Sequence, residues 1–379
     1  MNAPLDPRTL FNEGLEAYFG PLILLVIFFF IVVKNPLVPR SSRKFFLLEG
    51  VLLFVLILAS WSDKVLEGFG DDGIAYLFRR MTTFLNFAFS PLTCVLPILL
   101  YRKRGFSRID FLLVLPEFIN VILCLFSLNY PVVFFVTPIN GYSRSPFFFF
   151  PFAVDVFYAG VVGYYSTKQV NKPDSKFETT AVFVLFGCIF TAVIIQMTLQ
   201  LRFLIWSTAV LAVSAYYIFL CYGYVIYDQL TGAYSRDGFR LTFLTKKAKA
   251  GVLAMIDLNR LKQINDNSGH ESGDKALFNI SQILLHAKAK NARLYRYGGD
   301  EFVLVAPQGS LKAVQVMLAK CEIDAGALEP PLSFSYGVVE VSEGDDLFSR
   351  LEEADFLMYE MKRRYKGEIG TKPIIPVGI

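Results

Sequence analysis

Cysteine and histidine are scarce in this chain, and their scarcity argues against several classes of protein. The 379 residues include five Cys and two His. Four of the cysteines lie in apolar stretches, so the sequence suggests neither a disulfide framework nor a Cys/His metal cluster. Both histidines, His270 and His286, lie beyond the apolar stretches. A histidine-ligated haem or zinc within the apolar part is therefore not expected.

Charged residues are also few, and they are unevenly distributed. They make up 18% of the chain, whereas 54% of the residues are hydrophobic and the mean hydropathy is +0.46. This composition is too apolar for an ordinary soluble protein. Apolar runs dominate from Tyr18 to Tyr227, and after Asp228 the charge density rises to that of a cytosolic domain. We therefore predict a membrane domain at 1–227 and a soluble domain at 228–379.

The net charge of +4 does not call for a nucleic-acid partner. The cytoplasmic loops of the membrane domain and the end of the soluble domain account for it. No nucleic acid is expected among the partners of this protein.

The first domain contains apolar stretches of roughly the length that crosses a bilayer as a helix, which is about 20 residues. They lie at 18–33, 45–61, 81–101, 109–128, 147–166, 179–198 and 203–226. Helices of this kind satisfy every backbone polar group without water. The sequence thus predicts an α-helical membrane domain of about seven transmembrane helices. The first run follows no basic segment and precedes no cleavage site, so we expect it to be retained.

The distribution of Lys and Arg predicts the topology. The loops at 34–44, 102–108 and 167–178 hold eleven of these residues, against six in the segments on the opposite side. Loops rich in Lys and Arg stay in the cytoplasm. An odd number of spans then leaves the N-terminus outside and the domain after Asp228 in the cytoplasm.

The soluble domain shows an alternation of strand and helix patterns. "GVLAMIDL" at 251–258 is typical of a buried strand, and 272–290 has helical spacing of its apolar residues. Two strand-like runs flank Gly298-Gly299 and predict a hairpin with a glycine turn. A helix at 309–322, a strand at 332–341 and a helix at 346–366 complete the pattern. This order fits an α+β fold of the ferredoxin-like type.

Three carboxylates of this domain are expected at neighbouring strand ends. Asp257 ends a buried strand, and Asp300 and Glu301 occupy the hairpin turn. Clustered carboxylates repel each other unless a cation compensates, and Mg²⁺ prefers such oxygen ligands together with substrate phosphates. Lysines nearby would supply positive charge for a polyphosphate. Metal-assisted phosphoryl or nucleotidyl transfer is one interpretation, and a solvated acidic turn is the other.

A family resemblance favours the first interpretation. "YGGDEF" at 297–302 resembles the signature of the GGDEF family, the diguanylate cyclases that condense two GTP into cyclic di-GMP. Four further segments resemble motifs of that family in the same order: "DQLTGAYSRDGF" at 228–239, "DLNRLKQINDNSGHESGD" at 257–274, "SFSYGVV" at 333–339 and "ADFLMYEMKRRYKG" at 354–367. The resemblance covers about 228–368. It implies a ferredoxin-like nucleotidyl cyclase (GGDEF) domain that uses GTP and releases two pyrophosphates.

The resemblance also implies roles for individual residues. Asp257, Asp300 and the carbonyl of Leu258 would hold Mg²⁺ or Mn²⁺. Glu301 would complete the catalytic set with the two aspartates and help to orient or deprotonate the attacking 3′-hydroxyl. The residues expected to bind the substrate are Lys262, Asn265, Asp274, Gly298, Gly299, Lys362 and Lys366. Of these, Asn265 and Asp274 would read the guanine edge, the glycines would keep the turn free of side chains, and the lysines would meet the phosphates.

The sequence departs from the family pattern at several positions. Asn259 stands where the family has a second Asp, Leu261 where it has Phe, and Lys366 where it has Arg. These departures leave open an alternative, in which a catalytically degenerate domain binds GTP as a regulatory or interaction module of a membrane receptor. The positions of the family's product-inhibition motif hold Ala289 and Ala292, so tight product inhibition is not expected.

The resemblance implies further partners and a location. Each such domain binds one GTP, so catalysis would require a homodimer. The expected setting is a bacterial cytoplasmic (inner) membrane, with the lipid bilayer and downstream cyclic di-GMP receptors as partners. A transporter is disfavoured, since neither inverted repeats nor Gly/Pro-broken helix pairs are evident.

Three acidic residues within the apolar stretches are candidates for a sensor site. They are Glu49, Glu117 and Asp155. Ionisable residues in a membrane often mark a ligand or ion site. The alternative is interhelical pairing, or solvation near the end of a helix.

Overall fold

The computed structural model describes residues 6–70, 72–101, 108–138, 140–168, 175–199, 204–243, 250–365 and 367. The chain divides into two compact units, one comprising 1–170 with 174–221 and the other comprising 222–379 with 171–173. The division falls within the last helix of the apolar half.

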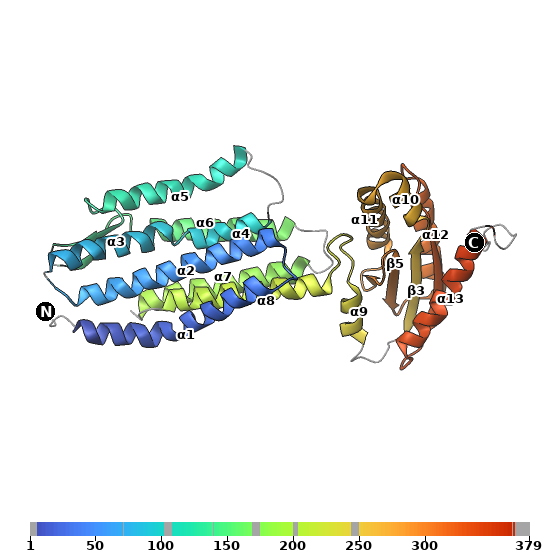
Figure 1. Ribbon diagram of the computed structural model, residues 1–379, viewed down its shortest axis with the longest axis horizontal. Coiled ribbons are helices and arrows are strands. Elements are labelled where there is room, and N and C mark those ends of the chain that lie inside the picture. Colours follow the sequence, from blue (N-terminus) through green and yellow to red (C-terminus); the bar gives the residue numbers. More distant parts are fainter. Residues whose placement is uncertain are drawn as a thin grey trace. The chain divides into compact units, whose positions relative to one another are not determined.

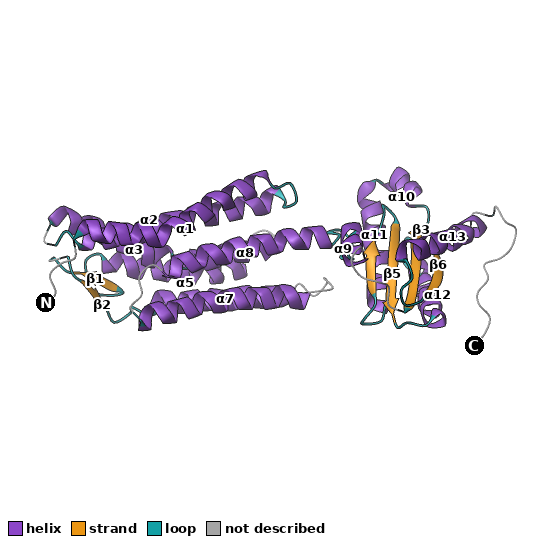
Figure 2. Cartoon of the chain, turned by 90° about the horizontal axis from the view of Figure 1, so that it is seen from below, coloured by secondary structure: helices purple, strands orange, loops and turns teal. Residues whose placement is uncertain are grey.

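The first unit is helical, with one small hairpin. Its helices are α1 (Pro7–Lys34), α2 (Arg40–Glu67), α3 (Gly73–Phe89), α4 (Leu92–Tyr101), α5 (Arg108–Ser127), α6 (Phe150–Lys168), α7 (Ser175–Thr198) and α8 (Leu204–Ile226). The strands β1 (Phe134–Val136) and β2 (Tyr142–Arg144) pair antiparallel between α5 and α6. Figures 1 and 2 show these helices running roughly alongside one another.

Three helices in the described part of the chain are long and apolar enough to cross a membrane. They are α1, α2 and α8, with 28, 28 and 23 residues. Two shorter apolar segments, Leu112–Ser127 and Thr180–Gln196, lie in α5 and α7. The prediction of a helical apolar region is confirmed, while the number seven stays a prediction.

The prediction of one continuous helix at 81–101 is wrong. This stretch forms two helices, because α3 ends at Phe89 and α4 begins at Leu92. Pro91 lies between them, and a proline inside a helix removes one backbone hydrogen bond and clashes with the preceding turn. The fifth apolar stretch also begins later than predicted, since α6 starts at Phe150 rather than 147.

The second unit is a four-stranded antiparallel sheet with helices. Its helices are α9 (Arg236–Phe243), α10 (Leu261–Ser268), α11 (His270–Ala287), α12 (Leu311–Gly326) and α13 (Leu347–Tyr365). Its strands are β3 (Gly251–Leu258), β4 (Arg293–Arg296), β5 (Glu301–Pro307) and β6 (Phe334–Val341). The strand order is β4-β5-β3-β6, as the ferredoxin-like prediction requires. The short helix α10 was not predicted.

The two faces of the sheet are covered by different helices (Figures 1 and 2). On one face, alternate residues of β3 such as Ile256 pack with Leu277 of α11 and Leu318 of α12. On the other face, Met255 packs with Leu351 of α13 and Phe239 of α9. Residues two apart on a strand share a face, so Asp257 lies on the α13 side with Met255.

Helix α13 lies unusually close to the sheet at Gly337. A Cβ atom added there would lie 2.1 Å from the carbonyl oxygen of Ala354 and 2.5 Å from the nitrogen of Met358. Only glycine permits this approach. The close packing holds the C-terminal half of α13 against the sheet, and Lys362 of that half reaches the end of β3.

Candidate active site

The core of the candidate site is a pair of carboxylates on adjacent strands. Asp257 is the second-last residue of β3 and Glu301 is the first residue of β5, and the two are register partners in the antiparallel ladder. Directly opposed residues of such a ladder place their side chains on the same face, about 5 Å apart at Cβ. Asp257 is only 5% exposed. The fold therefore brings together the two acids that the sequence placed at strand ends.

The glycine turn between β4 and β5 is held by its backbone. The amides of Tyr297 and Gly298 both donate to the carbonyl of Glu301, and the amide of Leu258 donates to the carbonyl of Asp300. A Cβ added to Gly298 would lie 2.3 Å from the Oε2 atom of Glu301, whereas one added to Gly299 would meet nothing within 4 Å. A side chain at 298 would therefore displace the Glu301 carboxylate, whereas Gly299 faces open space.

Lys362, near the C-terminal end of α13, contacts one of the two acids. The Nζ atom of Lys362 lies 2.5 Å from the Oδ1 atom of Asp257 and forms an ion pair with it. The side chain of Asp257 is 7% exposed and that of Lys362 is 24% exposed, so water screens this pair only in part. The predicted phosphate ligand Lys362 and the predicted metal ligand Asp257 therefore belong to one site.

The carboxylates of this cluster influence one another. Burial raises the pKa of Asp257, and the nearby Asp300 and Asp355 raise it further, while Lys362 opposes the change. Burial also raises the pKa of Glu301, and Asp257, Asp300 and Asp355 add to that effect. Their mutual repulsion is the condition that a bound cation relieves. Asp355 of α13 was not among the residues predicted from the sequence.

The donor chemistry of the cluster suits a hard divalent cation. Asp257, Asp300 and Glu301 offer carboxylate oxygens, the ligands that Mg²⁺ prefers. Within the described part of the chain, however, no three Asp, Glu, His or Cys side chains lie in an arrangement that could hold a metal ion together. Lys362 supplies the positive charge beside Asp257 in this arrangement. Substrate phosphates usually provide several of the ligands of Mg²⁺, so two carboxylates and a carbonyl suffice from the protein.

The predicted base-reading residues lie on the segment that follows β3. Lys262 and Asn265 are on α10 and Asp274 is in the first half of α11. Lys262 and Asp274 are exposed, and neither forms a hydrogen bond or an ion pair within the described residues. Asn265 is half-buried beside Gly273, where an added Cβ would lie 1.9 Å from its Oδ1 atom. Lys366 lies outside the described residues.

Asn259, the departure from the family's second Asp, has a structural role. It is 5% exposed, and its Oδ1 atom accepts a hydrogen bond of 3.0 Å from the hydroxyl of Ser335. Its Nδ2 atom donates to the hydroxyl of Ser333 at 3.4 Å. The side chain contacts Ser335 of β6 and Ser333 just before that strand, and these hydrogen bonds do not involve the acidic cluster. The neutral amide of Asn259 thus serves as donor to one hydroxyl and acceptor for the other.

The glycine turn is also tied to the first residues of the domain. Arg296 forms a salt bridge of 3.1 Å with Asp228 and donates to the carbonyl of Gly299 at 2.8 Å. Arg236 lies over the ring of Tyr297 at 4.9 Å. The sequence signal for Asp228 and Arg236 was their place in the opening motif, whereas the bridging role of Arg296 was not predicted.

The sensor candidates of the first unit separate into two groups. Glu49 of α2 and Asp155 of α6 line one cavity. Glu117 of α5 does not line it, and its Oε2 atom accepts a hydrogen bond of 3.4 Å from Asn120. The structure thus brings two of the three candidates to a common space.

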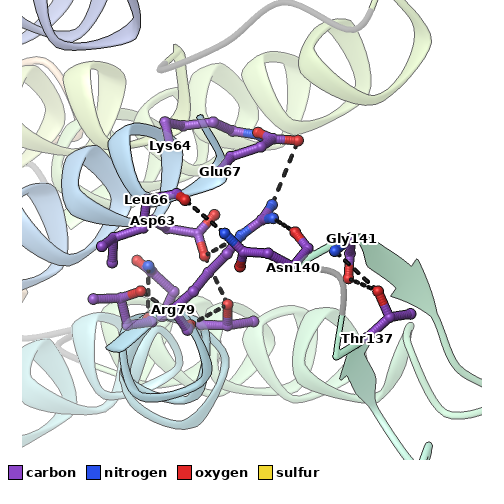
Figure 3. Close-up of polar contacts among 11 residues, drawn as sticks. Asp63, Lys64, Leu66, Glu67, Arg79, Thr137, Asn140 and Gly141 are labelled. Atoms are coloured by element: carbon purple, nitrogen blue, oxygen red, sulfur yellow. Dashed lines mark hydrogen bonds and ion pairs between the residues drawn. The ribbon is translucent and has the colours of Figure 1, made fainter. Parts of the chain in front are cut away.

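Another charged cluster of this unit was not predicted. Arg79 of α3 is 1% exposed and forms ion pairs with Asp63 at 3.5 Å and Glu67 at 3.4 Å. It also donates to the carbonyl of Asn140 in the β1–β2 hairpin, as Figure 3 shows. The cluster fastens α2, α3 and the hairpin to one another.

Comparisons with known proteins point to one domain family. Residues 225–368 match the family described as "Diguanylate cyclase, GGDEF domain". The chain is 32% identical over 165 residues to the diguanylate cyclase VdcA of Vibrio cholerae, covering 40% of this chain and 47% of that protein. It is 29% identical over 150 residues to the diguanylate cyclase DgcS of Shewanella oneidensis, covering 36% of this chain and 49% of that protein. The chain thus spans about half the length of these curated relatives.

Among solved structures, the coiled coil and GGDEF domain of DgcB from Caulobacter crescentus in complex with c-di-GMP is similar at 21% identity. The match covers 42% of this chain and 91% of that chain, with a TM-score of 0.39. Together, the family match, the curated relatives, the strand order and the acidic hairpin lead to one conclusion. Residues 225–368 of this chain form a GGDEF domain.

Proposed function

We propose that this protein is a membrane-bound diguanylate cyclase, which condenses two GTP into cyclic di-GMP and two pyrophosphates. The match of residues 225–368 to the diguanylate cyclase domain supports this proposal most directly. The carboxylates of Asp257 and Glu301 on adjacent strand ends, with Lys362 beside them, are consistent with it.

Asp257, Asp300 and the carbonyl of Leu258 are the groups that would hold Mg²⁺ or Mn²⁺. A divalent cation bound there would neutralise phosphate charge and stabilise both the attacking and the leaving oxygen. The burial of Asp257 and the repulsion among its neighbours favour a cation at this place.

The chemical step joins two nucleotides through the residues of two domains. The 3′-oxygen of one GTP forms a bond to the α-phosphorus of the other, and the bond from that phosphorus to the β-bridging oxygen breaks. Pyrophosphate leaves with the electron pair of the broken bond. Glu301, the register partner of Asp257, would orient the 3′-hydroxyl and accept its proton. Two such steps close the ring.

Three lysines would bind the phosphates. Lys262 is exposed with no ion pair in the described part of the chain, so its ammonium is available to a polyphosphate. Lys362 is paired with Asp257, and it would exchange that partner for phosphate oxygens when the metal takes its place. Lys366, four residues later in the sequence, would act in the same way.

Asn265 and Asp274 would select guanine. A carboxylate at 274 accepts hydrogen bonds from adjacent N–H donors, which the guanine edge offers. Adenine would leave this acceptor unpaired, and such a loss penalises the wrong base.

The membrane domain would hold two copies of the cyclase domain together and set their output. We propose seven spans, an outer N-terminus and a cytoplasmic C-terminal domain in an inner membrane; the three long apolar helices and the distribution of Lys and Arg support this topology. Helix α8 ends at Ile226, and the opening motif begins at Asp228. A rotation or shift of α8 would therefore act directly on the cyclase domain, with no coiled-coil stalk between them.

Turnover by single-residue variants tests the proposal. Membranes that contain the full chain should convert GTP to cyclic di-GMP only with Mg²⁺ or Mn²⁺. Asp257→Asn and Asp300→Asn should lower the rate by about a hundredfold or more, since loss of a preorganised charged group has this order of effect. Asp324→Asn, on the exposed side of α12, is the matched control and should keep the wild-type rate. An Asp300→Asn variant that forms cyclic di-GMP at the wild-type rate would contradict the proposed mechanism.

A further inference from the structure

A second site lies in the helical unit, and it is independent of the proposed cyclase function. We propose that this unit binds an organic cation, an amine with an apolar body, in the cavity lined by Glu49 and Asp155. The proposal rests on the cavity, on the unpaired carboxylates and on the aromatic walls, which are described in turn.

The cavity is large enough for a small organic molecule. Its volume is about 1030 Å³, and residues of α2, α3, α4, α6, α7 and α8 line it. Ligand sites in proteins typically have volumes of about 300–1,000 Å³ with mainly apolar walls and a few polar groups. The volume and the walls of this cavity match that description.

The acidic group in the cavity wall is buried without a partner. Glu49 is 3% exposed, and neither of its carboxylate oxygens has a hydrogen-bond partner. Asp155 lines the same cavity and forms no hydrogen bond or ion pair within the described part of the chain. A buried carboxylate without a partner is costly, and a cationic ligand offsets that cost.

The basic residues of the same cavity are engaged elsewhere. Arg79 is paired with Asp63 and Glu67, as Figure 3 shows, and Lys64 is paired with Glu67 at 3.2 Å. Arg144 lies over the ring of Phe148 at 4.8 Å. These cations therefore do not pair with Glu49 or Asp155, and the two acidic side chains of the cavity are left for a ligand.

The arrangement favours an organic cation over a metal ion. No three Asp, Glu, His or Cys side chains among the described residues are close enough to hold a metal. The walls instead present aromatic rings, among them Phe87, Phe152, Phe186 and Trp206. Aromatic faces attract ammonium groups and also bury an apolar body. An amine can pair with a carboxylate while the rest of the molecule fills the apolar space.

Tryptophan fluorescence provides a direct readout of binding. The chain has two tryptophans, and Trp206 lines the cavity whereas Trp61 lies against Phe11. In a Trp61→Phe background, the purified full chain in lipid nanodiscs is titrated with hexylamine, 2-phenylethylamine and 3,3-diphenylpropylamine. The corresponding alcohols serve as neutral probes of the same shape. We expect a saturable change in Trp206 emission with at least one amine and weaker or no saturation with its alcohol.

Variants of the two acids show whether charge holds the amine. Glu49→Gln and Asp155→Asn should each weaken amine binding about tenfold or more, while binding of the alcohol stays the same. Glu16→Gln, an exposed position on α1, is the matched control and should bind as the parent does. Glu49→Asp should recover part of the affinity. Thermal unfolding identifies any variant that does not fold, and the Asp155→Asn titration then decides the question.

Three outcomes would overturn the proposal. The first is that no amine changes the emission saturably. The second is that amines and alcohols bind equally well to the parent and to both acid variants, which would assign the cavity to an apolar occupant such as a lipid tail. The third is that only Mg²⁺ or Ca²⁺ gives a saturable change. Because the readout is fluorescence and not GTP turnover, failure of the cyclase function would leave this test intact.

Discussion

Gly298 and Gly299 are adjacent glycines with different surroundings, and substituting each in turn separates their roles. An added Cβ at 298 would contact the carboxylate of Glu301, whereas one at 299 would meet nothing. We expect Gly298→Ala to move that carboxylate and to weaken Mn²⁺ binding in the absence of nucleotide about tenfold, a common cost of disturbing a group beside a metal. Gly299→Ala should leave Mn²⁺ affinity unchanged. Calorimetric titration of the full chain with Mn²⁺ measures both.

Equal Mn²⁺ affinities for the two variants would mean that the Glu301 carboxylate does not contribute to the metal site. A loss in Gly299→Ala that appears only when GTP is added would instead indicate that nucleotide approaches this open side of the turn. The Mn²⁺ titration is therefore repeated in the presence of a non-hydrolysable GTP analogue. A loss of Mn²⁺ affinity seen only with the analogue would place the nucleotide next to Gly299.

At the residue scale, the sequence predicted the acids better than their basic neighbours. A continuous apolar run placed Asp257 at the end of a buried strand, and a glycine turn placed Glu301 beside the next strand. Adjacent strands then bring the two together. The ion pair of Lys362 with Asp257 joins residues 105 positions apart. That pairing depends on how closely α13 packs on the sheet, which no local pattern specifies. Arg296 and Asp355 were missed for the same reason.

At the element scale, the contact between β6 and α13 provides a second prediction. Gly337→Ala would drive a methyl group into the backbone of α13. We expect this variant to lower the free energy of unfolding by about 1–3 kcal/mol, the usual cost of overpacking. It should also reduce GTP turnover, because α13 carries Lys362. Gly326→Ala, where an added Cβ meets nothing within 4 Å, is the control. The full chain is unfolded with denaturant in the absence and presence of GTP. The unfolding transition that GTP shifts to higher denaturant concentration belongs to the second unit, and its midpoint gives the stability of that unit.

A Gly337→Ala variant with wild-type stability and turnover would show that α13 can shift freely from the sheet. The position of Lys362 would then not depend on the contact with β6. The proposed dependence of the Lys362–Asp257 ion pair on helix packing would then be wrong.

Helices and strands were predicted well where a single hydropathy pattern continued without a break. They were predicted poorly where a proline interrupted an apolar run or where the strands were very short. The strands β3, β5 and β6 have apolar runs bounded by turns, and all were expected. At 81–101 continuous hydropathy predicted one helix, but Pro91 divides it into α3 and α4. The hairpin at 134–144 was missed, since its strands have three residues each and are too short to show a period.

At the scale of the whole molecule, the account predicts that activity depends on bringing two domains together. In the proposed mechanism each domain binds one GTP, so an isolated domain would have to find a second one by diffusion. A short tether supplies an effective concentration of roughly millimolar. The segment 228–379 alone should therefore be nearly inactive at nanomolar concentration and regain activity when fused to a dimeric helix. Rates per molecule measured over a range of concentrations test this directly.

Residues 228–379 that matched the full-length rate per molecule at nanomolar concentration would contradict this assembly role. Whether they fold is checked beforehand by circular dichroism and by GTP binding. An inactive but folded and GTP-binding domain is the expected result.

The central claim is that this chain makes cyclic di-GMP, and the most direct measurement is the identity and stoichiometry of its product. The purified full chain in nanodiscs is incubated with GTP and Mg²⁺, and the nucleotides are separated and identified by mass spectrometry. The account predicts cyclic di-GMP, with two GTP consumed and two pyrophosphates released for each molecule formed, and no product without a divalent cation. GTP that is bound but returned unchanged, in a preparation shown to be folded and dimeric, would contradict it.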